Sequence, residues 1–305
     1  MSKTTTLTFF DDSTQGWERA LYAFLAEKQS RSGSRRTVDA YSRMIQDFFG
    51  RAGKPPDKVA SQEVFAWAHG KGASGKEPSA VTIGARMAAL SSFYKFLIRM
   101  EIVASNPCDR LERPKVQQAP PRGLSADEIR RLLAVIPNTK SGMRDRAIVL
   151  TLTLTGRRRT EVLEMKRGDL VNDSDRVYYS YRGKGGKTAK RELPRPAFDA
   201  IVEQLGAWGR DLGAMDKKES LWPTDDAERS RAGQGITSGT FYGNLRRYQR
   251  AAGLPVSGVH ILRHSAAKLR RDAGGRLDDV GIADREVDER IRVIPRRDLR
   301  APTFA

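Results

Sequence analysis

Apolar side chains recur at helical spacing along most of this chain of 305 residues, but residues 175–194 follow a different pattern. Within them, residues 177–181 (Val-Tyr-Tyr-Ser-Tyr) are rich in the β-branched and aromatic side chains that favour strands. Residues 183–187 (Gly-Lys-Gly-Gly-Lys) suit a tight turn, and residues 188–193 return as a second strand. The pattern predicts a mainly α-helical protein with a small β-hairpin or sheet.

The first part of the chain predicts a flexible arm, residues 1–12, followed by a helical domain, residues 13–112, whose loops carry many arginines and lysines. Four helices are expected in this domain. The longest is expected at residues 79–102, where apolar side chains recur every three or four positions and form a buried stripe: Ile83, Met87, Leu90, Tyr94 and Leu97. Residues 113–123 are rich in proline and charge, so they predict a linker between two domains.

A second domain is expected at residues 124–280, and it begins with a helix start signal. Ser125 can cap the helix while Glu128 reaches back to the Ser125 amide. The next helix, roughly residues 143–155, is almost wholly apolar after its first turn, so it should be buried. Residues 281–305 form a tail of atypical sequence.

An excess of positive charge points to a polyanionic partner. Lysines and arginines number 55 against 37 aspartates and glutamates, which gives a net charge of +18. Neutralising phosphates releases counterions and so drives binding. A membrane surface is the weaker alternative, because no apolar run approaches the roughly 20 residues that span a bilayer. Cys108 is the only cysteine, which excludes an internal disulfide and a cysteine zinc site and predicts a reducing, cytoplasmic location.

Three basic motifs lie in the second domain, in this order: residues 155–161 (Thr-Gly-Arg-Arg-Arg-Thr-Glu), the turn at residues 183–187, and residues 260–264 (His-Ile-Leu-Arg-His). The two histidines and the arginine of the last motif are spaced to share one face of a helix. Such a face offers ring nitrogens and a forked guanidinium to one ligand, for which a phosphate is the first candidate. A helix cap followed by a solvated basic face is the alternative for this motif alone.

Together, and downstream of a basic four-helix bundle, these motifs resemble those of the tyrosine recombinase family, the phage integrase type. The resemblance extends over roughly residues 13–280. It implies an N-terminal SAM-like core-binding domain and an α+β catalytic domain that bind double-stranded DNA. It also implies DNA breaking and rejoining at specific sites, as in recombination or the integration of a mobile element. Relatives act as homo-oligomers, tetramers on DNA, and need no metal ion or cofactor.

The resemblance assigns catalytic roles residue by residue. The pattern T-G-x-R-x-S/T-E places the first catalytic arginine at Arg158, and the catalytic lysine falls on Lys184. The pattern H-x-x-R-H places His260 and the second arginine, Arg263. Two guanidiniums can fork the oxygens of one phosphate and stabilise the charge that develops there. A lysine on a turn can protonate the leaving 5′-oxygen, and a histidine can hydrogen-bond the phosphate or carry the nucleophile's proton.

Other polar residues of these motifs are expected to support that pocket. Glu161 is expected to orient the arginines rather than to act as an acid or base, and His264 to have a structural or a chemical role. Arg157 and Arg159 flank the first catalytic arginine and are expected to contact the DNA backbone or solvent. Lys187, in the turn, is a further expected DNA contact.

The family's nucleophile has no counterpart in this sequence. In the family, a tyrosine roughly 30 residues after the second arginine attacks the phosphate and forms a phosphotyrosyl link. Here no tyrosine follows Tyr248, no histidine follows His264, and the resemblance stops beyond Val280. We therefore expect a protein that binds DNA and a scissile phosphodiester but is impaired in strand cleavage. We hypothesise that a frameshift or truncation near Val280 replaced the last helices.

Two alternatives share these motifs. A non-enzymatic DNA-binding protein would occupy recombination sites as a dominant-negative partner. A type IB topoisomerase-like enzyme would use the same arginine, lysine and histidine pocket, although the small helical domain and the short chain favour a recombinase.

Overall fold

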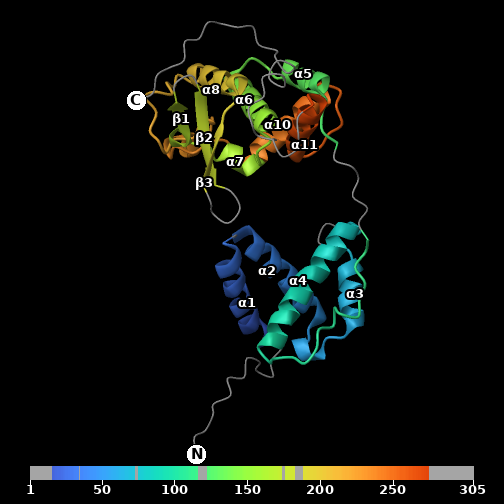
Figure 1. Ribbon diagram of the computed structural model, residues 1–305. Helices are drawn as coiled ribbons and strands as arrows, with labels where there is room; N and C mark the ends of the chain where they lie inside the picture. The colour runs from blue at the N-terminus through green and yellow to red at the C-terminus, as the bar shows by residue number, and fades with distance from the viewer. Residues whose placement is uncertain are drawn as a thin grey trace, which may run out of the picture. The chain divides into compact units, whose positions relative to one another are not determined.

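The computed structural model describes residues 16–33, 35–72, 75–115, 122–173, 176–182 and 188–274. The chain divides into two units, residues 1–119 and residues 120–305 (Figure 1). The division falls inside the predicted linker, whose exact limits stay a prediction. The predicted arm (residues 1–12) and tail (residues 281–305) lie outside the described residues. Within the described ranges, no helix is both long enough and apolar enough to cross a membrane.

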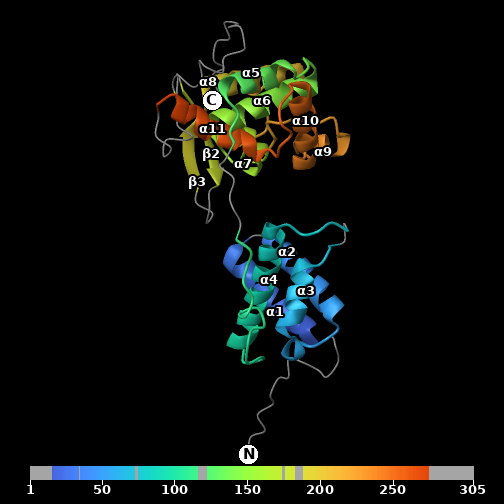
Figure 2. The same cartoon turned by 90° about the vertical axis from the view of Figure 1, so that its right-hand side faces the viewer.

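In its described part, the first unit is a bundle of four α-helices, as the apolar spacing predicts (Figure 2). The helices are α1 (Gly16–Ser32), α2 (Arg35–Ala52), α3 (Ser61–His69) and α4 (Ala80–Arg99), with a 3₁₀ helix at Pro56–Lys58 before α3. Helix α4 contacts the other three, and every residue of its predicted stripe is buried. It begins where Ser79 Oγ accepts a hydrogen bond from the Thr82 amide at 3.3 Å, which caps the helix.

The second unit combines α-helices with a small antiparallel sheet. The α-helices are α5 (Ala126–Ala134), α6 (Lys140–Thr155), α7 (Arg159–Leu163), α8 (Arg195–Ala207), α9 (Ala227–Arg231), α10 (Ser238–Ala251) and α11 (His260–Asp272). A 3₁₀ helix, Arg167–Asp169, leads into the sheet, whose three strands follow the order β1 (Leu170–Asp173), β2 (Arg176–Arg182) and β3 (Thr188–Glu192). The predicted hairpin is confirmed in β2 and β3, where Arg182 pairs with Thr188 beside the turn.

Two elements of this unit go beyond the sequence prediction. Strand β1 has only four residues, too few to show an alternating pattern, and it is a strand because it pairs with β2, with Leu170 opposite Tyr179. Helix α9 has only five residues, has no counterpart among the helices expected from the sequence, and buries none of its residues. Its start depends on Asp226, whose Oδ1 accepts from the Arg229 amide at 3.1 Å.

The predicted capping box at the start of α5 is confirmed. Ser125 Oγ accepts from the Glu128 amide at 3.2 Å, and Glu128 Oε2 accepts from the Ser125 amide at 2.7 Å. The bond from the Ser125 amide is the main reason why the pKa of Glu128 lies below its ordinary value.

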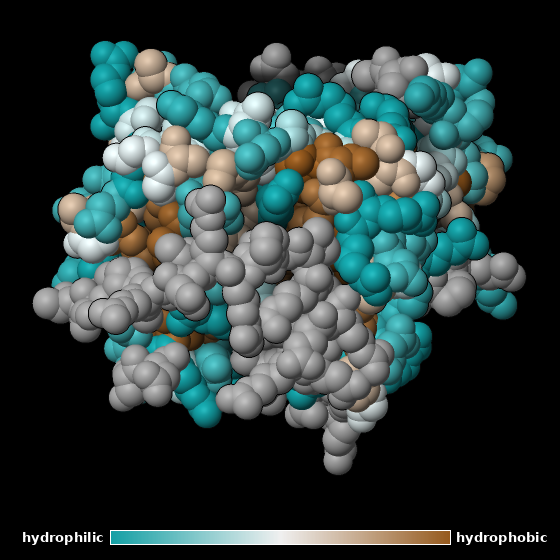
Figure 3. Space-filling view, turned by 90° about the horizontal axis from the view of Figure 1, so that it is seen from above, coloured by the Kyte–Doolittle hydropathy of each residue, from teal (hydrophilic) through white to brown (hydrophobic). Residues whose placement is uncertain are grey.

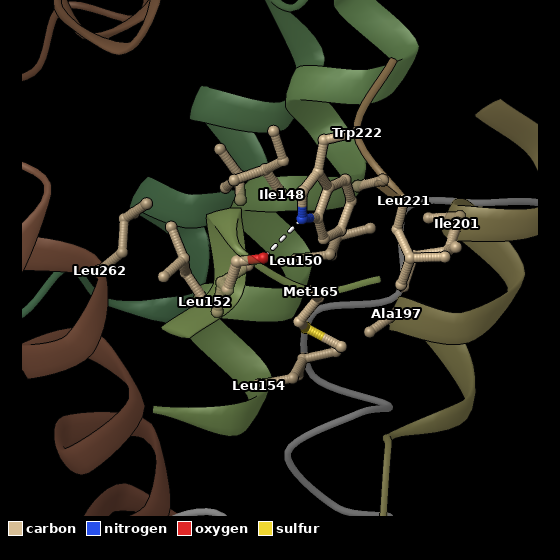
Figure 4. Packing of buried hydrophobic residues seen from close by; sticks show 14 of the residues in the cluster. Ile148, Leu150, Leu152, Leu154, Met165, Ala197, Ile201, Leu221, Trp222 and Leu262 are labelled. Atoms are coloured by element: carbon tan, nitrogen blue, oxygen red, sulfur yellow. Dashed lines mark hydrogen bonds between the residues drawn. The ribbon is translucent and has the colours of Figure 1, made fainter. Parts of the chain in front are cut away.

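Helix α6 is the centre of the second unit, with α8 and α11 packed against it (Figure 1). Figure 4 shows the apolar side chains of α6 meeting Ala197 and Ile201 of α8, with Leu262 of α11 on the opposite side. The Trp222 side chain is fully buried in this core, and its indole N–H donates to the Val162 carbonyl at 2.5 Å. The near-continuous burial of α6 is what its apolar sequence predicts, although it starts at Lys140, where Thr139 caps it, rather than near Met143.

The surface seen in Figure 3 is mainly hydrophilic, with smaller hydrophobic areas between polar side chains. Exposed large apolar side chains are spread over several elements and include Tyr22 on α1, Phe65 on α3, Val81 and Ile98 on α4, Val171 on β1 and Tyr242 on α10. Single exposed apolar side chains are ordinary on a folded protein, so none of these marks a docking site by itself.

Candidate functional site

The candidate site is built around the turn that ends α6. Gly156 takes a left-handed conformation (φ 61°, ψ 19°), and its amide donates to the Leu152 carbonyl at 3.0 Å. Glycine adopts this conformation without the steric cost that a side chain brings, and it therefore ends the helix cleanly. The turn delivers the chain into α7, with Arg158 at the position that caps the new helix.

Arg158 is held by Glu161 and remains open to solvent. Its backbone amide donates to Glu161 Oε2 at 3.1 Å, and its Nη1 donates to Glu161 Oε1 at 2.8 Å. The Arg158 side chain is 53% exposed, whereas that of Glu161 is 10% exposed. The buried Glu161 carboxylate therefore orients the Arg158 guanidinium, and about half of the Arg158 side chain stays exposed to solvent.

Arg263 brings α11 to the same turn. Its Nη1 donates to the Gly156 carbonyl at 2.8 Å, across 107 positions of sequence. Partial burial lowers the pKa of the Arg263 guanidinium, and the positive charge of Arg158 lowers it further. Glu161 acts in the opposite direction, and Arg157 again lowers the pKa. The structure thus gathers three guanidiniums within electrostatic range of one another and of one carboxylate, an arrangement that favours an anion.

Both histidines of the third motif lie on the exposed surface of α11. His260 is the first residue of the helix and His264 lies one turn further along, with the half-buried Arg263 between them. Within the part of the chain that the structure describes, both side chains are exposed and neither imidazole makes a hydrogen bond. The expected shared helical face is present.

Long-range polar contacts hold α11 in place. Ser265 is fully buried; its Oγ donates to the Ile261 carbonyl and accepts from the Leu124 amide, each at 2.8 Å. Gly123 packs so tightly that an added Cβ would lie 2.5 Å from the His264 carbonyl oxygen. The loop that precedes His260 is held by Gln249 of α10. Gln249 Nε2 donates to Ser257 Oγ at 2.9 Å, and the Ser257 amide donates to Gln249 Oε1 at 3.0 Å. These contacts fix the helix that carries three candidate residues.

Arg157 and Arg159 differ in their surroundings. The Arg157 guanidinium lies over the ring of Tyr181 in β2, 3.9 Å from its centroid. Arg159 is the first residue of α7 and is half-buried. Contact of either residue with DNA stays a prediction, but the stacked position of Arg157 is a feature that the sequence does not reveal.

Lys184 and Lys187 lie outside the described residues, as do the residues after Gly274. The roles assigned to these lysines and the predicted lack of a nucleophilic tyrosine therefore stay predictions from the sequence. Strands β2 and β3 are described on both sides of these residues, which the sequence predicts as a turn.

Two models of known families match the chain. The "Phage integrase family" matches residues 122–280, and the "Phage integrase, N-terminal SAM-like domain" matches residues 19–101. The first match contains the described part of the candidate site and covers more than half of the chain.

Curated relatives extend the similarity across both units. The tyrosine recombinase XerC of Xanthomonas campestris pv. campestris (strain B100) is 30% identical over 270 residues, which is 86% of this chain and 78% of the relative. The tyrosine recombinase XerA of Thermococcus kodakarensis is 38% identical over 160 residues, 52% of each chain.

Solved structures share the fold. A lambda integrase (75–356) dimer bound to a COC′ core site has a TM-score of 0.61 and 19% identity, over 90% of this chain and 93% of that one. The XerH site-specific recombinase bound to difH substrate, in a pre-cleavage complex, has a TM-score of 0.61 and 16% identity, over 93% of this chain and 87% of the other. A lambda integrase tetramer bound to a Holliday junction has a TM-score of 0.63 and 19% identity, over 87% and 76%.

Proposed function

Because the chain belongs to the phage integrase family of tyrosine recombinases, we propose that it binds duplex DNA and holds one backbone phosphate between Arg158 and Arg263. The observation that carries this proposal is the bond from Arg263 to the Gly156 carbonyl, at the turn that presents Arg158. The bond brings the Arg263 guanidinium to the turn that precedes Arg158, and the charge of Arg158 acts on Arg263, which supports a phosphate site shared by the two side chains. Guanidiniums so placed can bind the two non-bridging oxygens of a phosphodiester and stabilise added negative charge.

The remaining roles follow the family pattern. His260, at the exposed start of α11, hydrogen-bonds the phosphate, and His264 supports it from the next turn. Lys184, three positions beyond Tyr181 in sequence, donates the proton that a leaving 5′-oxygen needs. Glu161 keeps Arg158 in position, as its two hydrogen bonds support. Lys187 and Arg159 contact the DNA backbone.

Strand cleavage is impaired in this proposal, because the chain lacks a tyrosine where the family carries its nucleophile. The last tyrosine, Tyr248, is unsuited to replace it, since its hydroxyl is committed to Asp145 at 2.9 Å. Burial raises the pKa of Tyr248, and the charge of Asp145 raises it further. A phenol with a raised pKa inside a core is a poor nucleophile.

The test separates binding from cleavage. We expect the full chain to bind duplex DNA with a steep salt dependence and to bind orthovanadate, a phosphate mimic. Arg158→Ala and Arg263→Ala should each weaken orthovanadate binding about tenfold or more, measured by calorimetry. Arg130→Ala is the control, because it removes the same charge from α5, where Arg130 pairs with Asp127. If Arg158→Ala leaves orthovanadate binding unchanged, the pocket is wrongly assigned.

Cleavage is measured separately, on nicked duplexes selected for binding to this chain. We expect no covalent protein–DNA adduct on a denaturing gel. A 3′-linked adduct that survives every tyrosine and tail substitution would contradict impaired cleavage while leaving the phosphate pocket intact.

A non-enzymatic partner is the second candidate function, favoured by the same lack of a nucleophile. In this case the chain occupies recombination sites in the cytoplasm as a member of a homo- or hetero-oligomer on DNA, up to a tetramer. When it is mixed with an active relative on that relative's site, recombination should fall as this chain is added. An unchanged or higher yield would rule out the dominant-negative role.

A further inference from the structure

We propose that Arg157 is a third anion-binding guanidinium of the phosphate pocket, held in place by the ring of Tyr181. The inference rests on the proposed function and deepens it. In the pattern T-G-x-R-x-S/T-E, Arg157 occupies a position to which the family assigns no role. This chain therefore adds a cation to the pocket of its family.

Geometry is the first support. Arg157 directly follows the left-handed Gly156, whose carbonyl accepts a hydrogen bond from Arg263, and it directly precedes Arg158. Its guanidinium carbon lies over the Tyr181 ring, 3.9 Å from the ring centroid. A cation stacked in this way uses its face on the ring and keeps the N–H groups at its edge for an acceptor.

The ring itself is firmly placed. Tyr181 packs against the core of the second unit, and its ring lies 5.9 Å from that of Tyr179, which is 1% exposed. An arginine side chain loses conformational entropy when it is ordered. Because the rigid ring already holds Arg157 in place, a ligand that binds it has less of this entropy cost to offset.

Unbalanced charge is the second support. Among the described residues, Arg157 pairs with no carboxylate, and its buried Nε makes no hydrogen bond. Burial raises the pKa of Tyr179 and the nearby Arg157 charge lowers it, so the Arg157 side chain also lies close to the Tyr179 hydroxyl. The charges that act on Arg263 are two further arginines, Arg157 and Arg158, and a single carboxylate, Glu161, which Arg158 already engages. An anion bound at this point relieves the mutual repulsion of the cations.

The effect of Arg157 on Arg263 links it to the same pocket. The positive charge of Arg157 lowers the pKa of Arg263, which shows that the two guanidiniums interact electrostatically. A phosphate that contacts Arg263 therefore lies within the field of Arg157 as well. The expected consequence is tighter binding of the phosphate.

Orthovanadate binding to the full chain tests the inference. We expect Arg157→Gln to weaken it about five- to tenfold, because one charge-assisted contact is lost. Arg159→Gln removes the same charge two positions away, and we expect a smaller loss, about twofold, from the long-range field alone. Arg157→Lys keeps the positive charge but loses the planar guanidinium, so its loss of orthovanadate affinity should lie between those of Arg157→Gln and Arg159→Gln.

Variants of the platform separate binding from folding. Tyr181→Leu should reproduce most of the loss seen for Arg157→Gln, whereas Tyr181→Phe keeps the ring and should retain the affinity of the parent. Thermal melting checks that each variant remains folded. If Arg157→Gln and Arg159→Gln lose the same amount, or if Tyr181→Leu binds like the parent, the inference is wrong. Failure of the proposed function gives a different result, in which Arg263→Ala also leaves orthovanadate binding unchanged.

Discussion

The two units of this protein are built on different interiors. The core of the first unit is dominated by aromatic rings in mutual contact: Trp17, Phe24, Phe48, Phe49, Trp67, Phe93, Tyr94 and Phe96. The core of the second unit is mainly aliphatic and includes buried polar groups from several helices. In the described residues, the buried polar side chains of the first unit are Ser91 and Asn106 alone, whereas the second unit buries an ion pair.

That ion pair belongs to a buried hydrogen-bond network that links α6 to α10. Asp145 of α6 accepts from Arg144 at 2.9 and 3.0 Å, from Asn244 of α10 at 2.7 Å and from Tyr248 at 2.9 Å. Arg144 in turn donates to the Pro223 carbonyl at 2.9 Å. Polar bonds have direction, so they fix the register of α10 against α6 more narrowly than apolar contact does. The unit that holds the candidate site is also the unit in which helix positions are specified by polar bonds.

Removing Asp145 should have the largest effect. Asp145→Ala leaves Arg144 buried without its partner and takes the acceptor from Asn244 and Tyr248. We expect a loss of about 3–5 kcal/mol in the free energy of unfolding. Denaturant unfolding measures the loss, and hydrogen exchange should place it in the second unit only.

Asp127→Ala is the matched control for this prediction. Asp127 is exposed on α5 and pairs with Arg130, so its removal should cost less than about 1 kcal/mol. Equal losses for the two variants would show that the buried network contributes no more than a surface pair, and the contrast between the interiors would fail.

Each unit buries a tyrosine whose hydroxyl donates a hydrogen bond, and the two bonds differ in the charge of the acceptor. Tyr248 donates to the charged Asp145, whereas Tyr94 in the first unit donates to the neutral Pro56 carbonyl at 2.9 Å. Bonds to charged acceptors are stronger, so Tyr248→Phe should cost about 2 kcal/mol and Tyr94→Phe about 1 kcal/mol. Denaturant midpoints at constant m give the two values. A larger cost for Tyr94→Phe would reverse the proposed order.

The smallest effect is expected at the helix caps, which both units share. The pKa of Glu63 is lowered mainly by its bond from the Ala60 amide and then by Lys54, and that of Glu128 mainly by its bond from the Ser125 amide. Each carboxylate therefore stabilises the fold fully above the ordinary glutamate pKa of 4.5, and this contribution is lost as pH falls through the lowered value.

Substitution of these glutamates tests the sign. Glu63→Gln and Glu128→Gln should each cost less than about 1 kcal/mol at neutral pH and should flatten the loss of stability below pH about 4.5. The two units should respond alike, in contrast to their interiors. Steeper acid unfolding in either variant would contradict the direction of the pKa shifts.

Much of the helical framework could be predicted because it depends on local pattern. The stripe of α4, the burial of α6 and the Ser125 capping box all follow from spacing within a few turns of helix. Strand β1 could not be predicted, because it forms through pairing with β2. Helix α9 could not be predicted either, because it is a helix of one turn with no buried apolar face. Pairing and docking energies come from residues that are distant in sequence.

For the candidate site, the amino-acid sequence alone determined which residues to consider: Arg158, Lys184, His260 and Arg263 carry the motifs, and no tyrosine follows Tyr248. Only the tertiary structure decided that Arg263 bonds the Gly156 carbonyl and that Arg157 stacks on Tyr181. The physical reason is distance along the chain. Motifs are local and can be recognised in order, whereas a shared anion site needs the folded core to bring α6, β2 and α11 together.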